Sequence, residues 1–135
     1  WRRALELLGA ARWCSVRVGV QLLNAAMRAC ERGSAWELAL GLLGSMGRDA
    51  LRPDGTAYTV ASMACGRGWL WRQALGNLSR MQEVSLELGL ASFNAAARAV
   101  ANAAEWSQAL SLLSKLRSRK LSPDEVTCGA LVKAC

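Results

Sequence analysis

Apolar positions along this chain repeat every 35 residues. Tryptophan opens each period, at Trp1, Trp36, Trp71 and Trp106. Apolar or small residues follow each tryptophan at offsets of 3, 4, 7 and 10 positions; after Trp36 they are Ala39, Leu40, Leu43 and Met46. These offsets lie on one face of an α-helix. The pattern therefore predicts four copies of one amphipathic helix.

A second helix face occupies the other half of each period. Its first apolar column holds Leu23, Tyr58, Phe93 and Cys128, and its last holds Cys30, Cys65, Val100 and Cys135. Small or apolar residues fill two columns between them, again at helical offsets. We predict helices, and no strands, near residues 2–13, 20–32, 35–48, 55–67, 70–84, 90–103, 105–119 and 124–135.

Turn residues separate these helices. Gly33 and Gly68 stand between paired helices, and Pro-Asp dipeptides end at Asp54 and Asp124 between pairs. The run from Ser122 to Glu125 predicts a capping box with Ser122 as the N-cap. Helix pairs at a constant period of this length indicate an all-α, right-handed solenoid. We expect Trp36, Trp71 and Trp106 to be mostly buried between successive pairs.

Composition excludes several kinds of chemistry. Histidine is absent, so His general bases, Ser-His and Cys-His nucleophiles and His-containing metal sites are excluded. The five cysteines form no Cys-x-x-Cys motif, and Val100 replaces Cys in one column, so we expect Cys30, Cys65 and Cys135 to be reduced, buried and metal-free. No acidic cluster or Gly-rich phosphate loop is evident, so we expect no enzymatic activity, cofactor or small-molecule substrate.

The length and ends of the chain complete this picture. A hydrophobic content of 53% in 135 residues predicts one folded domain. No apolar run approaches the roughly 18 residues of a membrane span. The chain opens on Trp1 instead of Met, and we interpret it as a piece of a longer protein.

One stretch resembles a known repeat family. WSQALSLLSKLRSRKLSPDEVT, which starts at Trp106, is similar to the consensus of pentatricopeptide repeats, and the stretch from Trp36 to Thr59 carries the same phrase. The resemblance covers nearly the whole chain: three units at about 20–54, 55–89 and 90–124, a trailing helix within 1–19 and a leading helix within 125–135. The Trp-initiated helices resemble the variety common in dinoflagellates and related algae. The second unit ends in Gly89, where the family has Asp.

This resemblance implies that the chain reads single-stranded RNA, one base per unit. The first base-reading position falls on Asn24, Thr59 and Asn94, and on Gly129 of the partial last unit; the second falls on Asp54, Gly89 and Asp124. In the family, Asn with Asp favours uracil, whereas Thr with Gly matches no defined pair. A base-sandwiching position falls on Gln21, Thr56, Ala91 and Val126, of which only Val126 has the expected aliphatic type.

Helical spacing independently predicts a polar stripe beside the apolar faces. Asn24, Arg28 and Arg32 step by four along one helix. The following copies of the stripe are Thr59, Met63 and Arg67; Asn94, Arg98 and Asn102; and Gly129 and Lys133. The formal net charge is +7, which suits an anionic partner. We predict that Arg28, Arg32, Arg67, Arg98 and Lys133 contact the RNA backbone.

Several alternatives remain open. Any solvated helix shows a polar stripe, and Asp54 and Asp124 could serve only as helix caps. Trp13 and Trp69 lie outside the periodic column and are candidates for exposed contacts. Three units cannot select one site in a transcriptome, because each base contact discriminates by only about 1–3 kcal/mol.

We therefore predict an RNA-binding module that acts in RNA processing, stability or translation in a mitochondrion or plastid. One alternative is a helical-repeat scaffold that binds other proteins, or a structural subunit of a large organellar assembly such as a ribosome. Another is the RNA-guiding part of an enzyme whose catalytic domain lies outside this chain.

Overall fold

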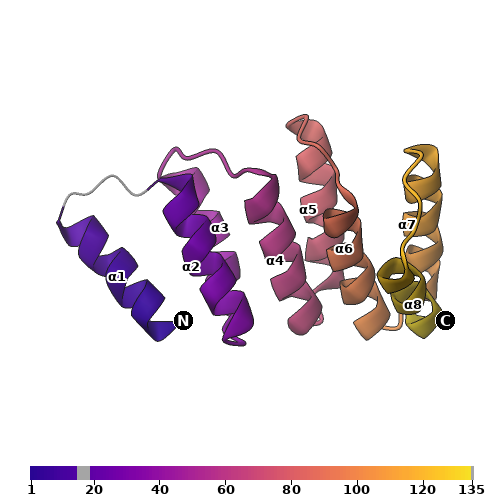
Figure 1. The fold of residues 1–135 in the computed structure, drawn as a ribbon, viewed down its shortest axis with the longest axis horizontal. Helices are drawn as coiled ribbons and strands as arrows, with labels where there is room; N and C mark the ends of the chain where they lie inside the picture. The colour runs from indigo at the N-terminus through magenta and orange to yellow at the C-terminus, as the bar shows by residue number, and fades with distance from the viewer. Residues whose placement is uncertain (15–18, 135) are drawn as a thin grey trace.

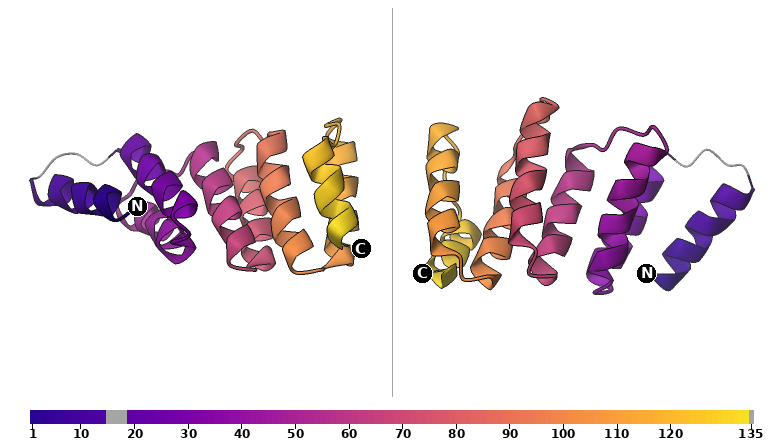
Figure 2. Two further views of the ribbon diagram at one scale, coloured as in Figure 1. Left: turned by 60° about the horizontal axis from the view of Figure 1, so that its bottom comes forward. Right: turned by 180° about the vertical axis from the view of Figure 1, so that it is seen from behind.

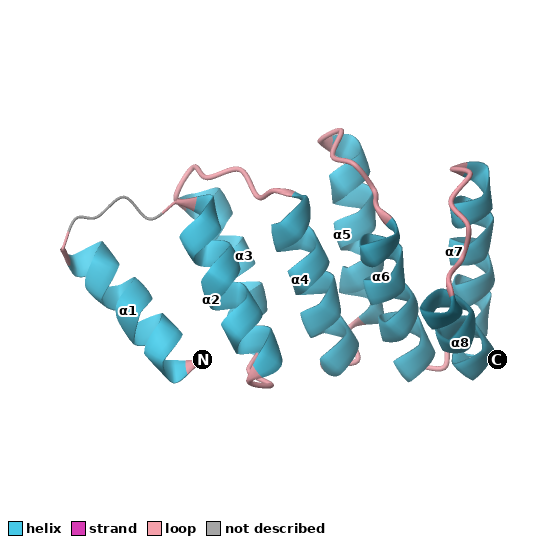
Figure 3. Cartoon of the chain, viewed as in Figure 1, coloured by secondary structure: helices cyan, strands magenta, loops and turns pink. Residues whose placement is uncertain are grey.

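The computed structural model describes residues 1–14 and 19–134 (Figure 1). This part contains eight helices and no strand (Figure 3). They are α1 (Arg2–Trp13), α2 (Val20–Arg32), α3 (Trp36–Arg48), α4 (Gly55–Arg67), α5 (Trp71–Glu83), α6 (Leu90–Asn102), α7 (Trp106–Ser118) and α8 (Glu125–Ala134). Each predicted helix end lies within one residue of the observed end. No helix in the described ranges is long and apolar enough to cross a membrane.

The helices stand in one row and in two layers (Figures 1 and 2). Among the first helices, α2 lies close to α4, α4 to α6, and α6 to α8, whereas the backbones of the second helices in the described ranges lie further apart. Contacts thus join only neighbouring elements, as in a solenoid. The all-α solenoid is confirmed. Its layer of first helices is the more closely packed one.

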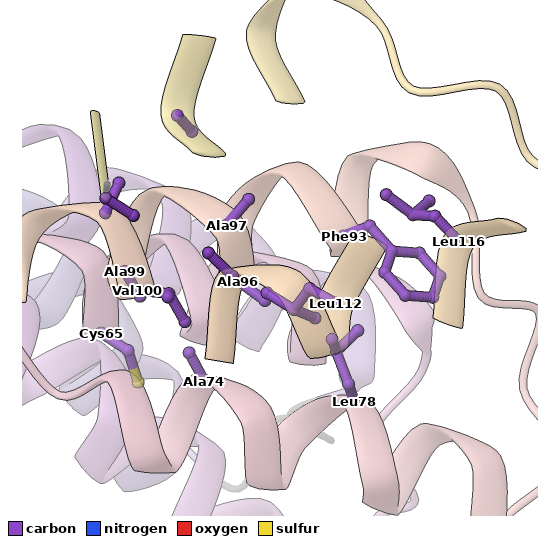
Figure 4. Packing of buried hydrophobic residues seen from close by; sticks show 14 residues of the cluster. Cys65, Ala74, Leu78, Phe93, Ala96, Ala97, Ala99, Val100, Leu112 and Leu116 are labelled. Atoms are coloured by element: carbon purple, nitrogen blue, oxygen red, sulfur yellow. The ribbon is translucent and has the colours of Figure 1, made fainter. Parts of the chain in front are cut away.

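Small side chains allow the first helices to approach one another. In α6, Ala96, Ala97, Ala99 and Val100 are fully buried or nearly so. Phe93 of the same helix is 2% exposed and belongs to a core with Leu112 and Leu116 of α7 and Leu78 of α5 (Figure 4). Interhelix distance depends on side-chain size at the contact, so the alanine face brings α6 close to α4 and α8.

Six turns end in a left-handed residue that is not glycine. These residues are Ser34, Ala50, Trp69, Ser85, Ala104 and Lys120, with φ between 54° and 61°. In each turn the next N–H reaches the carbonyl five residues earlier, as in the 2.9 Å bond from Ala35 to Cys30. This bond is the signature of a Schellman helix ending.

The turn glycines make room for tryptophan. Gly33 and Gly68 have φ of −81° and −90°, which any residue adopts. A Cβ atom on Gly33 would lie 2.1 Å from the indole of Trp1, and one on Gly68 would lie 2.8 Å from the indole of Trp36. Glycine is therefore required at both positions because the indole packs closely there, and the backbone is not left-handed at either.

The predicted burial of the tryptophans is wrong at Trp106. Trp36 and Trp71 are half-buried against the core, but Trp106 is 60% exposed. Trp1 and Trp36 pack on glycines 32 positions further along the chain. For Trp106 that position would be 138 (106 + 32), past residue 135. Most of the Trp106 surface is therefore open to solvent.

The cysteines also differ in burial. Cys30 and Cys65 are buried free thiols, as predicted, and Cys135 lies outside the described residues. Burial raises the pKa of Cys65 to about 11. Cys128, expected on an apolar face with Phe93, is exposed because it lies on α8 at the end of the row. A metal-free state of the thiols stays a prediction.

Candidate nucleic-acid interface

Two aspartates begin first helices at the unit boundaries. The Asp54 carboxylate accepts a 2.8 Å hydrogen bond from the N–H of Ala57, and Asp124 accepts a 2.7 Å bond from that of Thr127. These are N-cap bonds. The predicted cap at Ser122 is wrong, because α8 begins only at Glu125 and Asp124 supplies the acceptor. The backbone N–H of Thr127, its hydroxyl and the Asn94 amide together lower the pKa of Asp124.

Each cap aspartate also pairs with an asparagine of the preceding first helix. Asn24 Nδ2 lies 3.0 Å from both carboxylate oxygens of Asp54. Asn94 Nδ2 donates to Asp124 Oδ2 over 2.8 Å. The structure thus brings together the two predicted reading residues in the first and third units. The two aspartates do more than cap their helices.

The middle unit has no such pair. Thr59 Oγ1 donates to the Gly55 carbonyl over 2.7 Å, and Gly89 has no side chain to offer. Ser92 Oγ lies 2.9 Å from Thr59 Oγ1. Since the single Thr59 proton serves Gly55, Ser92 is the donor in that contact. The middle unit therefore presents hydroxyl groups without a carboxylate.

An open hollow of about 590 Å³ lies beside the middle unit on the layer of first helices. Thr59 and Gly89 both line it, so the missing side chain at Gly89 leaves this space open. Arginine and acidic side chains also reach it from the neighbouring units. Its lining residues are Arg28, Glu31, Arg32, Asp54, Gly55, Thr56, Thr59, Val60, Met63, Met81, Glu87, Gly89, Ala91 and Ser92.

The predicted backbone-contacting cations fall into two groups. Arg28, Arg32 and Arg98 are exposed. Arg67, in contrast, forms a 2.9 Å ion pair with Glu31, a residue only 7% exposed. Lys133 donates to the amide oxygen of Asn102 over 3.1 Å. Two of the five cations are thus already engaged within the protein.

The partner of Arg67 was missed in the sequence. Glu31 and Arg67 are 36 positions apart, and Asn102 donates to the carbonyl of Gly66 across the same interval. Residues 36 apart therefore tie the carboxyl ends of successive first helices together. A search at that spacing, one longer than the repeat, would have found the acidic residue opposite the arginine.

Comparison with solved structures shows which fold this is. No family model and no curated protein matches the sequence. Among solved structures, the pentatricopeptide repeat protein PPR10 in complex with an 18-nt psaJ RNA element matches with a TM-score of 0.79 over 86% of this chain, at 23% identity. The chain has the pentatricopeptide repeat fold. A triple Cys-to-Ser variant of PPR10 with the same RNA element gives the same values.

A further structure, of PPR10 from maize, matches with a TM-score of 0.56 and 18% identity over 98% of this chain. The chain spans about 17% of the length of the RNA-bound PPR10 structures and 24% of the maize structure. At these identities the likeness establishes the fold alone.

The other positions singled out from the pentatricopeptide pattern lie at the surface. Gln21, Ala91 and Val126 are exposed, and Thr56 is half-buried at the hollow. Gly129 is exposed and, having no side chain, offers no reading group. Trp13 and Trp69, the candidates for exposed contacts, are 89% and 67% exposed.

Proposed function

We propose that the chain is a single-stranded RNA-binding repeat module in which Asn24–Asp54 and Asn94–Asp124 each read one base. The recurrence of the same amide–carboxylate pair at equivalent places in two units carries the proposal. Both pairs span 30 residues, so each joins the first helix of a unit to the residue that closes it. The RNA bound in the PPR10 structures supports it by analogy of fold.

The chemistry of the pair favours one kind of base edge. One amide N–H bonds the carboxylate, which leaves the second N–H beside a carboxylate oxygen. A donor next to an acceptor complements a carbonyl next to an imino N–H, as at O4 and N3 of uracil. For a base held in the same orientation, cytosine and adenine present the reverse order. Guanine shares the uracil order at a larger ring, and the family resemblance selects uracil.

The middle unit is proposed as a base-tolerant spacer. Thr59 and Ser92 hold each other, and no carboxylate stands at Gly89. A base there meets hydroxyl groups and an open hollow in place of a defined donor–acceptor pair. Two uracil sites separated by one unspecified nucleotide are therefore expected.

Phosphate contacts are assigned to Arg28, Arg32 and Arg98. Three contacts on a single strand predict a slope of log K against log salt of about −2, from roughly −0.7 per contact. Arg67 is expected to add less because Glu31 already neutralises it. Binding by this chain alone is weak and depends strongly on salt.

The wider role proposed is non-enzymatic participation in organellar RNA processing, stability or translation. Two reading pairs supply too little discrimination to select one transcript, so this role needs further units or protein partners. The exposed Trp13 and Trp69 favour the alternative of a protein-binding scaffold.

Fluorescence anisotropy with short uracil-rich and uracil-free RNA tests the proposal at several salt concentrations. Asn24→Ala combined with Asn94→Ala is expected to abolish the uracil preference and leave most of the salt-sensitive affinity. Arg28→Ala with Arg32→Ala is expected to weaken binding to every sequence, and Arg48→Ala with Arg80→Ala, which removes two exposed arginines of the second helices, serves as the matched control. Equal affinity of the unaltered chain for both RNAs contradicts base reading. Absence of salt-sensitive binding contradicts the proposal and favours the scaffold.

A further inference from the structure

The third residues of α4, α6 and α8 occupy the same place in the repeat, and those of α6 and α8 bond the reading residue of the preceding unit. These residues are Ala57, Ser92 and Thr127, each 33 positions after Asn24, Thr59 and Asn94. The Thr127 hydroxyl bonds the amide oxygen of Asn94, and Ser92 bonds Thr59. Ala57 has no hydroxyl and makes no such bond. The same place in the repeat is thus filled by groups of different hydrogen-bonding capacity.

The alanine leaves a polar atom without a partner. Asn24 is 8% exposed, and its Oδ1 is a buried side-chain atom with no hydrogen bond among the described residues. No other described side chain has such an atom. Burying an acceptor without a partner costs free energy, which favours rotation of the amide toward water. The Asn24 amide is therefore held at Nδ2 alone.

The Asn94 amide, in contrast, is held at both ends. Asp124 accepts from Nδ2 over 2.8 Å, and Thr127 faces Oδ1. The Thr127 hydroxyl also lies 2.8 Å from Asp124 Oδ1. Its one proton serves one acceptor at a time, and both acceptors belong to the reading pair. Thr127 therefore restrains the pair as a whole.

We propose that the third residue of each first helix is a positioning residue for the base-reading side chain of the unit before it. The two Asn–Asp pairs are then unequal despite their identical residues: Asn94–Asp124 is preorganised, and Asn24–Asp54 is not. Preorganised donors discriminate better because no ordering is needed on binding. This inference rests on the proposed function.

The experiment isolates each site in the full 135-residue chain. Asn94→Ala leaves only the Asn24 site, and Asn24→Ala leaves only the Asn94 site. Uracil preference is the ratio of dissociation constants for RNA with a single cytosine and with a single uracil in a common background. We expect a higher preference at the Asn94 site.

Substitution of the positioning residue is expected to change the uracil preference of the site that it contacts. In the Asn94→Ala background, Ala57→Thr raises the uracil preference about fivefold, the value of one net hydrogen bond. Ala57→Ser is the smaller substitute, should the added methyl group disturb folding at this buried place. Ala57→Val is the matched control, since it has the shape of Thr without the hydroxyl. In the Asn24→Ala background, Thr127→Val lowers the preference about fivefold.

A measurement on the free protein separates this inference from RNA binding. Nitrogen-15 relaxation of the side-chain amides is expected to show Asn94 more ordered than Asn24, with Thr127→Val loosening Asn94 and Ala57→Thr ordering Asn24. Uracil preference without any difference between Thr and Val variants overturns the inference and leaves the proposed function standing. Equal order of the two amides overturns the inference whether or not RNA binds.

Discussion

Between α4 and α6 the apolar columns of the repeat are covered, whereas in α7 and α8 some members of the same columns are exposed. Phe93 is 2% exposed, and its column-mate Cys128 is exposed. Trp36 packs on Gly68, but Trp106 is 60% exposed. A column tells which way a side chain points, but the burial of its outermost members depends on the neighbouring helices. Burial in a repeat protein is therefore a property of the junction between units.

The largest expected contrast lies in the column of Phe93. Phe93→Ala is expected to lower the free energy of unfolding by about 3–5 kcal/mol, because it opens a cavity among α5, α6 and α7. Cys128→Ala, in the same column, is expected to change it by less than about 0.5 kcal/mol. Urea denaturation followed by circular dichroism measures both. Similar losses for the two variants contradict the difference between the regions.

The tryptophan column gives a smaller contrast. Trp36→Ala is expected to cost about 2 kcal/mol, since the ring is half-buried against α4, and Trp106→Ala less than about 1 kcal/mol. The same denaturation experiment applies. A cost at Trp106 equal to that at Trp36 would show that the ring is covered in solution.

The contact between Gly68 and Trp36 can also be tested by enlarging the glycine. Gly68→Ala is expected to destabilise the chain by about 1–3 kcal/mol, because the new methyl group meets the indole. Gly76→Ala is the control: Gly76 lies within α5 with open space around it, so alanine is expected to stabilise by about 0.5–1 kcal/mol. Thermal melting distinguishes the two signs.

The cysteines give a difference in stability that depends on pH. Cys65 has an ordinary pKa of 9.0 that burial raises to about 11. Its neutral thiol supports the fold fully below pH 9, and this contribution is lost as pH rises toward 11, where only the unfolded thiol has become charged. Cys65→Val, which introduces the residue found at Val100 in the next unit, is expected to reduce the alkaline loss of stability. A thiol reagent is expected to label Cys128 and spare Cys65 in the native chain.

The sequence predicted the helices well because the same pattern of apolar and turn residues marks each helix boundary in several copies of the repeat. One period places every helix, and agreement among copies corrects the ambiguity of any single one. The Asn–Asp pairs were predicted through the family resemblance, and the structure adds their distances and their link to the helix caps. The cap itself was misplaced at Ser122, since Ser-Pro-Asp-Glu offers two acceptors and only the structure shows where α8 begins.

Other features could not be predicted from single columns. Whether a tryptophan such as Trp106 is buried depends on a residue of another column, and the tryptophan column alone does not show whether that residue is present. The ion pair of Arg67 with Glu31 joins different columns of different units. The column of Ala57, Ser92 and Thr127 is mixed in character, so it shows no pattern until the asparagines that it faces are placed in space.

The left-handed turn residues are places where substitution by glycine could stabilise this chain. Each of Ser34, Ala50 and Ser85 adopts a backbone that costs a side-chain-bearing residue about 1–2 kcal/mol, part of which glycine would recover after its own entropy loss. None of the six turn residues lines the hollow beside the middle unit. Glycine at several turns would therefore supply a sturdier background in which costly changes to the reading residues could be compared without loss of folding.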